Sequence, residues 1–327
     1  MRHTFHTEPA HAITPGVTVL RDGAIFGVVF CDGARHGVIL YHLPDGEETR
    51  IELTDEHRFG SLYSVRVSGL RTGEWGYRYY SGDRTFEDPY ARGFVSIGDG
   101  SGKLRVCRFY HAPEDILPVY SPKELPAWQD QFLYCLHVRG FTMDPAAGVR
   151  HPGTFSGVTE KIPYLQSLGV TGVELMPVYE PRLPEQPARR SYEVDRLGRP
   201  RRREDEDPYW WYGEGYYFAL RESYGSEDPQ KEFAEMVEAL HGAGIRVFLQ
   251  MSFPETVSAH TQCDALRFYV THYGIDGFRL LGSVTALYAI VSDPLLSDTA
   301  ILYREFPYGE IRRINADNPW SGAPRTG

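Results

Sequence analysis

One predicted strand has two leucines at its carboxyl end, where a reactive side chain would be expected. The segment Gly274–Ser283 (GIDGFRLLGS) has a short turn, an apolar run and a further glycine, which is typical of a buried strand that runs into a loop. In α/β enzymes the working side chains emerge at the carboxyl ends of such strands. Here Arg279 is followed by Leu280 and Leu281, and a leucine side chain can neither attack a substrate nor stabilise a charge.

A dense aromatic cluster is the second feature that could bind a ligand. Seven of the ten residues in 209–218 (YWWYGEGYYF) are tyrosine, tryptophan or phenylalanine. Aromatic rings stack on flat apolar faces of ligands, but most of them pack in protein cores. We expect Tyr216, Tyr217 and Phe218 to be core residues, whereas both roles stay open for Tyr212.

Composition and charge narrow the class of protein. The chain has 327 residues, of which 42% are hydrophobic and 24% are charged, a globular composition with room for about two domains. The net charge of -10 argues against a nucleic-acid partner, because phosphates need compensating lysines and arginines. The N-terminus has no apolar signal region, and no apolar stretch is long enough to span a membrane. We therefore expect a cytoplasmic protein without a membrane partner.

The cysteines predict neither a metal site nor disulfide bonds. Cys31, Cys107, Cys135 and Cys263 are far apart and form no CxxC pair, so they do not match a zinc-binding pattern. In a reducing compartment they are expected to be free thiols in packed positions. We expect no metal and no cofactor.

The first part of the chain has the pattern of an all-β domain. Short apolar runs alternate with turns over residues 15–95, and this predicts an immunoglobulin-like β-sandwich. Four of its strands are expected at 24–30, 37–43, 61–67 and 75–80. Residues 1–14 are expected to be a tail, and residues 96–130 a linker, because GDGSGK is followed by a proline-bearing stretch.

Residues 131–327 change to repeated strand–helix–strand units, which form parallel sheets. No Gly-rich phosphate loop follows the first strand, so the units favour a partial (β/α)8 TIM-type barrel over a doubly wound sheet. Strands are expected at 132–138, 170–178, 245–253, 276–281 and 300–306, and helices at 154–169, 228–244, 263–273 and 284–291. The polar stretch 181–208 is expected to be a surface insertion. The fold class is therefore multidomain, β plus α/β.

Several stretches resemble one family and keep its order along the chain. They are FLYCLHVRGF with GVTGVELMPV (within 132–178), YWWYGEGYYFALRESYG (209–225), GIRVFLQMSFPE (244–255), DGFRLL (276–281) and EDPYAR (87–92). Together they resemble the pullulanase-type and isoamylase-type debranching enzymes of the α-amylase superfamily, which is glycoside hydrolase family 13. The resemblance covers about residues 15–310 and implies a glycogen-binding-type β module before the barrel, and an α-glucan or maltooligosaccharide as ligand.

The resemblance also implies that the catalytic nucleophile is missing. Retaining glycosidases need two carboxylates about 5–5.5 Å apart, one of them as nucleophile. In this family the nucleophile is an aspartate two positions after the arginine of Gly-Phe-Arg-x-Asp. Gly-Phe-Arg is present at 277–279, but Leu281 occupies the position of the aspartate.

The remaining catalytic positions are only partly kept. Glu305 in ILYREF matches the position of the family's acid/base and is the candidate catalytic residue. At the end of the third predicted strand, 245–253, Gln250 and Glu255 stand where the family has the Asp and His of Asp-Val-Val-x-Asn-His. The resemblance gives Arg279 the role of contacting the nucleophile. With a leucine there, Glu255 or Glu305 could pair with Arg279, because an unpaired buried arginine is costly.

For substrate contacts the resemblance points to the aromatic cluster. Tyr212 lies at the position that the family places beside the cleaved sugar, and Trp210 precedes it in the same segment. Trp211 replaces a family glycine, so its indole would crowd or cover the pocket. The substrate-binding candidates are Tyr212, Trp210, Trp211, Arg279 and Glu255.

The predicted barrel has five strands, and a complete barrel needs about 250 residues. The family's third carboxylate, after the seventh strand, has no counterpart. Open sheet edges promote aggregation, so we expect a truncated form of a longer protein. A partner chain that covers the edge, or a different closure of the sheet, remains an alternative.

The favoured function is a catalytically inactive, α-glucan-related homologue of the debranching enzymes that binds glycogen or maltooligosaccharides. One alternative is an active glycosidase with relocated carboxylates, Glu255 and Glu305. The other is an interaction protein whose open barrel edge docks a partner.

Overall fold

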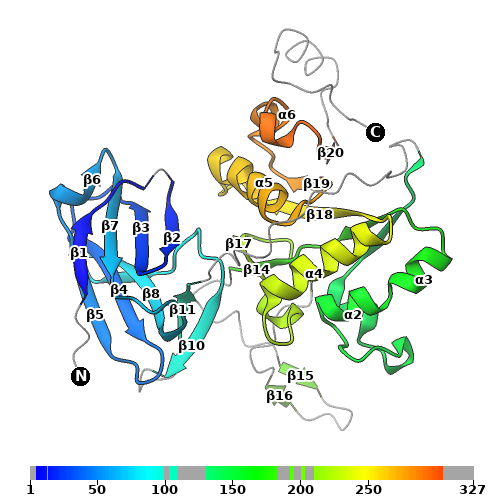
Figure 1. Ribbon diagram of the computed structural model, residues 1–327, viewed down its shortest axis with the longest axis horizontal. Helices are drawn as coiled ribbons and strands as arrows, with labels where there is room; N and C mark the ends of the chain where they lie inside the picture. Colours follow the sequence, from blue (N-terminus) through cyan, green and yellow to red (C-terminus); the bar gives the residue numbers. More distant parts are fainter. Residues whose placement is uncertain are drawn as a thin grey trace. The chain divides into compact units, whose positions relative to one another are not determined.

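The computed structural model describes residues 5–12, 14–98, 103–109, 130–182, 192–194, 200–202 and 210–304. The chain divides into two compact units. The first consists of Met1–Ile116 and Tyr216–Glu222, and the second of Leu117–Gly215 and Ser223–Gly327. Both units are drawn in Figure 1.

The first unit contains two antiparallel sheets. One has the order β1-β7-β3-β2, with β6 beside β7, and the other has the order β10-β11-β8-β4-β5, with β9 beside β8. The strands of the first sheet are β1 (His6–Pro9), β2 (Gly16–Leu20), β3 (Gly23–Val29), β6 (Arg58–Phe59) and β7 (Leu62–Ser68). Those of the second are β4 (His36–His42), β5 (Glu48–Leu53), β8 (Trp75–Ser81), β9 (Arg84–Phe86), β10 (Phe94–Gly98) and β11 (Lys103–Arg108).

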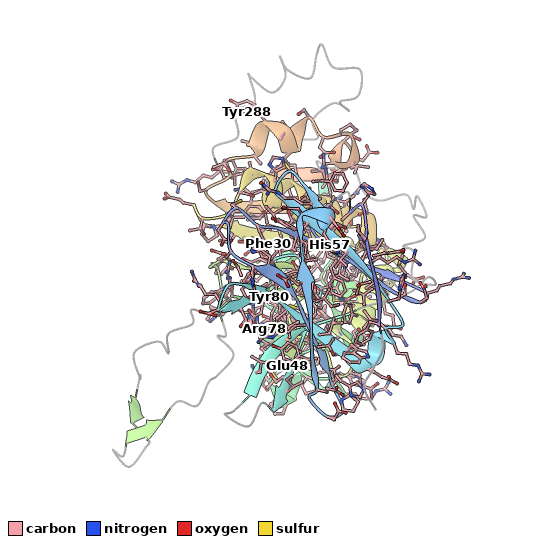
Figure 2. All side chains as sticks on the ribbon, turned by 90° about the vertical axis from the view of Figure 1, so that its left-hand side faces the viewer. Phe30, Glu48, His57, Arg78, Tyr80 and Tyr288 are labelled. Atoms are coloured by element: carbon pink, nitrogen blue, oxygen red, sulfur yellow. The ribbon has the colours of Figure 1, made fainter. Side chains whose placement is uncertain are left out.

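Alternation along the strands builds one core between the two sheets. In β8, Tyr77 and Tyr79 pack in the same buried cluster as Phe26 and Val65 from the other sheet. Tyr80 belongs to a separate apolar cluster, because successive side chains of a strand point to opposite faces. Figure 2 labels Tyr80 on this strand. The tyrosines of the first unit are thus mainly structural.

This unit extends further along the chain than expected. β1 lies in the expected tail. In the range 96–130, which was expected to be a linker, the structure has the end of β10 and all of β11. β11 pairs with both β10 and β8, so the sequence interpretation ended the sheet too early. The glycines of GDGSGK favoured a loop, and the strand that follows them was not recognised because it begins with KLRV, a short run that carries two charges.

The second unit contains a five-stranded parallel sheet with the order β12-β13-β18-β19-β20. Its strands are β12 (Leu133–Leu136), β13 (Gly172–Leu175), β18 (Arg246–Phe253), β19 (Gly277–Gly282) and β20 (Ala300–Leu302). The short strands β14 (Tyr179–Pro181), β15 (Tyr192–Val194) and β16 (Pro200–Arg202) follow β13 in the chain, and β15 and β16 form a hairpin in the expected insertion. The next strand, β17 (Gly215–Leu220), belongs to the first unit from Tyr216 on. All five strands predicted for this half are present over the described residues.

The α-helices of the second unit are α1 (Val138–Thr142), α2 (Phe155–Glu160), α3 (Ile162–Ser167), α4 (Pro229–Gly242), α5 (Ala259–Tyr273) and α6 (Leu287–Val291). Asp228 begins α4 by accepting hydrogen bonds from the backbone N–H groups of Gln230 and Lys231, and Ser258 begins α5 in the same way. Helices α2 and α4 lie side by side (Figure 1). None of the described helices is both long and apolar enough to cross a membrane.

Several of the expected elements are shorter than predicted, and for two of them the structure shows the reason. The expected helix 154–169 is divided at Lys161 into α2 and α3, because Pro163 lacks the N–H group that would continue the helix. The expected strand 132–138 ends at Leu136, since His137 caps α1 by accepting a hydrogen bond from the Gly140 N–H group. This strand is also less buried than expected, and Cys135 is exposed.

Candidate functional site

The carboxyl ends of the parallel strands bring a set of polar residues to one face. Strand register aligns Cys135 with Glu174, Gln250 with Arg279, and Ser252 with Leu281. Glu174 also aligns with Phe248, and residues two apart in a strand share a face. The shared face therefore carries Cys135, Glu174, Gln250, Ser252, Arg279 and Leu281, which we call the site face.

A large ring forms the layer below these residues. Phe248 is 1% exposed and lies between two glycines of the neighbouring strands. A Cβ atom at Gly277 would be 2.5 Å from the Phe248 ring, and one at Gly172 would be 3.3 Å from it. The two glycines therefore make room for the ring, and the ring fills the sheet beneath the site face.

Glu174 is the centre of the site face. Its side chain is 4% exposed and accepts two hydrogen bonds from Arg279, Nε to Oε1 at 2.6 Å and Nη2 to Oε2 at 2.7 Å. Gln250 donates a third bond, Nε2 to Oε1 at 2.5 Å. The bonds to Glu174 raise the pKa of the Arg279 guanidinium. Glu174 is thus a fixed anionic acceptor with both oxygens in use.

Tyr212 is connected to Glu174 through hydrogen bonds with neighbouring residues of the site face. Its hydroxyl donates to Oε1 of Gln250 at 2.8 Å, and its backbone carbonyl accepts from Oγ of Ser252 at 2.7 Å. Partial burial raises the pKa of the Tyr212 hydroxyl, and the nearby Cys135 and Glu174 add to this effect. The ring is nevertheless 41% exposed, so it is held at two points and still reachable by a ligand.

The two tryptophans before Tyr212 differ in their surroundings. Trp210 is 57% exposed, and its ring centroid lies 4.7 Å from that of His137. Trp211 turns back onto its own loop, where Nε1 donates to the Glu214 carbonyl at 2.9 Å. A Cβ atom at Gly213 would be 2.8 Å from the Trp211 ring. Trp210 is therefore the more accessible of the two indoles.

Leu281 is partly exposed at the end of β19, and the loop after it is fixed. The Ser283 N–H group donates to the Phe253 carbonyl at 2.7 Å. The buried Gln262 donates to the Ser283 carbonyl at 3.0 Å and accepts from the Ala286 N–H group at 3.2 Å. The position predicted for the nucleophile is therefore well defined, and an apolar side chain fills it.

The predicted site residues are only partly brought together. Arg279 and Tyr212 are connected through Glu174 and Gln250, and the two tryptophans lie in the loop that carries Tyr212. Glu255 is exposed in the turn after β18 and, among the described residues, forms no ion pair with Arg279. Glu305 lies outside the described residues. The expected pairing of Arg279 with Glu255 is therefore wrong, because Glu174 takes that place.

Sequence reasoning missed Glu174, although a signal for it existed. The strand VTGVELMPV contains one charged residue among apolar ones, and a buried charge needs a partner. The sequence also predicted that Cys135 would be packed, but this residue is exposed on the site face, with Gln250 Nε2 at 3.4 Å from its sulfur atom. Burial on one side raises the pKa of Cys135.

The site face offers polar groups and an exposed ring to a ligand, and among its described residues there is no second carboxylate beside Glu174. Among the described strand residues of the site face, Glu174 is the one carboxylate. Glycoside hydrolysis with retention needs two, one of them placed to attack. The part of the chain that the structure describes also contains no group of three or more His, Cys, Asp or Glu side chains that could hold a metal ion.

Comparisons with known proteins identify the family of the chain. Residues 98–262 match the family described as "Alpha amylase, catalytic domain". Chloroplastic isoamylase 3 from Oryza sativa subsp. japonica is 31% identical over 231 residues, which are 66% of this chain and 28% of that protein. A glycogen debranching enzyme from Dickeya chrysanthemi is 32% identical over 227 residues, covering 59% and 30% of the two chains.

Solved structures with the same fold include the pullulanase of Anoxybacillus sp. LM18-11 in complex with maltotetraose. It superimposes with a TM-score of 0.70 at 20% identity and covers 91% of this chain and 50% of that one. The chain thus spans half the length of this pullulanase and less than a third of the two relatives above. The shared fold is an α-amylase-type barrel with β domains.

Proposed function

The chain belongs to the α-amylase family, among its isoamylase-type and pullulanase-type debranching members, and from this premise we propose that it is a non-catalytic α-glucan-binding protein. One observation carries the proposal. Leu281 occupies the end of β19, and the one carboxylate among the described strand residues of the site face is bound by Arg279 and Gln250. A buried carboxylate held by three N–H groups cannot move to attack a sugar.

The aromatic residues support the binding half of the proposal. Tyr212 and Trp210 are 41% and 57% exposed, and exposed rings stack on the apolar faces of sugars. Related folds are found with such ligands, since the Anoxybacillus pullulanase structures contain maltotetraose and maltotriose. The ligand we propose is an unbranched α-glucan chain, presented as maltooligosaccharide or as the outer chains of glycogen.

The proposal includes the domain organisation. We propose that residues 15–95 form the core of an immunoglobulin-like β-sandwich of the glycogen-binding type, and that residues 131–327 form part of a (β/α)8 barrel. The two antiparallel sheets with a common core support the first statement. The parallel order β12-β13-β18-β19-β20 supports the second, because it is the order in which barrel strands follow one another.

Calorimetric titration of the full chain with maltotetraose tests the binding. We expect saturable binding that weakens about tenfold when Tyr212 is replaced by alanine, since loss of one stacking ring costs about 1 kcal/mol or more. The matched control is Tyr164→Ala on α3, because Tyr164 is 43% exposed and lies outside the site face. Equal weakening by both variants, or no binding by the wild type, would refute the proposed site.

A further inference from the structure

Two carboxylates near the aromatic loop are each paired with an arginine. Glu174 pairs with Arg279 at 2.6 Å. Glu214, at the end of the loop that carries Tyr212, pairs with Arg182 at 2.5 Å and accepts a hydrogen bond from Thr256 at 2.7 Å. Each pair sums to zero charge, so these described side chains give the site no net negative charge.

The Glu174–Arg279 pair presents only its cationic side to a ligand. The Arg279 side chain is 41% exposed, whereas that of Glu174 is 4% exposed. Nε and Nη2 of Arg279 are used by Glu174, and Nη1 makes no hydrogen bond with any residue in the described part of the chain. A guanidinium nitrogen with two N–H donors therefore remains available to a ligand.

The neighbour of Arg279 on the accessible side is apolar. Leu281 lies two residues further along the same face, and like Arg279 it is partly exposed. A retaining glycosidase has carboxylates in this part of the site, because the sugar becomes cationic in the transition state and a carboxylate stabilises that charge. Here a ligand would meet a cationic donor and an aliphatic side chain, and both disfavour a positive charge.

We propose that Arg279 and Leu281 make this site selective for uncharged sugars and against cationic ones. A hydroxyl of a neutral sugar can accept a hydrogen bond from Nη1 while the ring stacks on Tyr212. A protonated amine in the sugar ring would lose its hydration and meet the exposed Arg279 guanidinium, while both oxygens of the buried Glu174 are already bound by Arg279 and Gln250. The inference rests on the proposed function, since it assigns the ligand class of the same site.

The test compares two trisaccharides that differ in charge. The full chain is titrated with maltotriose and with maltosyl-1-deoxynojirimycin, whose ring nitrogen replaces the ring oxygen, at a pH where this amine is protonated. We expect maltotriose to bind at least about tenfold more tightly, since like charges within a few ångströms repel strongly where water is partly excluded. Added salt should reduce the difference, because it screens this repulsion.

Two variants at one position separate charge from shape. Leu281→Asp places a carboxylate on the site face, and we expect it to tighten binding of the amine sugar by about tenfold or more with little effect on maltotriose. Leu281→Asn has nearly the same shape as Leu281→Asp without the charge, and it should reduce the selectivity much less than Leu281→Asp does. Thermal unfolding of both variants verifies that they are folded.

The outcomes distinguish this inference from the proposed function. Equal binding of both sugars to the wild type, or the same change in both variants, would overturn the charge selectivity and leave glucan binding intact. Binding of neither sugar would overturn both.

Discussion

Glu174 and Arg279 form a charge pair whose two ends have different surroundings. The glutamate side chain is 4% exposed and the arginine side chain is 41% exposed. Loss of Arg279 would leave a buried carboxylate without its main partner, whereas loss of Glu174 would leave a guanidinium that water can reach. At the residue scale, the loss of Arg279 and the loss of Glu174 should therefore cost different amounts of stability.

This asymmetry predicts different costs for the two substitutions. Arg279→Leu should lower the free energy of unfolding by about 3–5 kcal/mol, the usual cost of stranding one buried partner. Glu174→Gln should cost only about 1–2 kcal/mol, because glutamine still accepts a hydrogen bond and Arg279 becomes hydrated. Urea unfolding followed by circular dichroism measures both values.

The double variant is the control for this prediction. Replacing Glu174 and Arg279 together by leucine removes the stranded charge, so it should cost less than Arg279→Leu alone. A larger loss for Glu174→Gln than for Arg279→Leu would show that the arginine, and not the glutamate, is the buried member of the pair.

Asp88 in the first unit is a second buried carboxylate, and its partners are tyrosines instead of an arginine. It is 1% exposed and accepts hydrogen bonds from the Tyr77 hydroxyl and from the Tyr90 N–H group, both at 2.8 Å. Burial raises its pKa from 3.8 to about 6, and these hydrogen bonds only partly offset the effect. The folded protein therefore binds a proton here more tightly than the unfolded chain does.

The raised pKa of Asp88 predicts that the first unit loses stability as the pH rises from about 4 to about 6. In this range the folded form keeps the proton and the unfolded form releases it, so unfolding becomes more favourable by up to about 2–3 kcal/mol. Above the folded pKa this contribution stays constant. Urea unfolding as a function of pH, compared between the wild type and Asp88→Asn, measures it.

Asp83→Asn is the matched control, because Asp83 is an exposed aspartate of the same unit. It should keep the wild-type pH dependence, whereas Asp88→Asn should lose most of it. A pH dependence in Asp88→Asn as steep as in the wild type would assign the effect to another group.

At the scale of elements, Gly282 sets the path of the chain directly after Leu281. Its φ is 78°, and a Cβ atom there would be 2.5 Å from the Phe253 carbonyl oxygen. Gly244 between α4 and β18 has nearly the same φ, 76°, but a Cβ atom there would meet nothing within 4 Å. Substitutions at these two glycines therefore distinguish the cost of backbone strain, which both positions share, from the cost of steric overlap, which only Gly282 has.

Alanine at these two positions should have unequal effects. Gly244→Ala should cost about 1 kcal/mol for the left-handed backbone alone, and Gly282→Ala about 2–4 kcal/mol because β18 and β19 must also move apart. We expect only Gly282→Ala to weaken maltotetraose binding, since it displaces the end of β19. Equal losses of stability, measured by urea unfolding, would mean that the overlap is relieved at no cost.

The elements that the sequence predicted well are those with long apolar runs or strong caps. β18 and α4 lie within one or two residues of the expected ranges 245–253 and 228–244, because an uninterrupted run and an Asp-Pro start are local signals. β5 and β11 were missed, since ETRIEL and KLRVCR are short, charged and stabilised by pairing with distant strands. Local sequence does not report such pairing.

At the scale of the whole molecule, the site is assembled from segments that are far apart in the chain. Arg279 and Glu174 are separated by 105 residues, and Tyr212 and Gln250 by 38. The family resemblance predicted which segments meet and that Leu281 lies among them. It could not predict that Glu174 would pair with Arg279, because that depends on the register of three neighbouring strands.

Two sequence-based expectations stay predictions at this scale. Among the described strands, β12 and β20 each pair on one side only, and a partner chain at either edge is untested. Glu305, the expected acid/base, lies outside the described residues. Turnover by the intact chain bears directly on the second of these expectations.

The most direct measurement is the release of reducing ends when the full chain is incubated with pullulan, glycogen and maltotetraose. A site face without a free carboxylate predicts no release above a control without protein, even under conditions where calorimetry shows maltotetraose bound. Release that rises in proportion to protein concentration, and that Glu305→Gln abolishes while binding persists, would contradict the assignment of a non-catalytic glucan-binding protein.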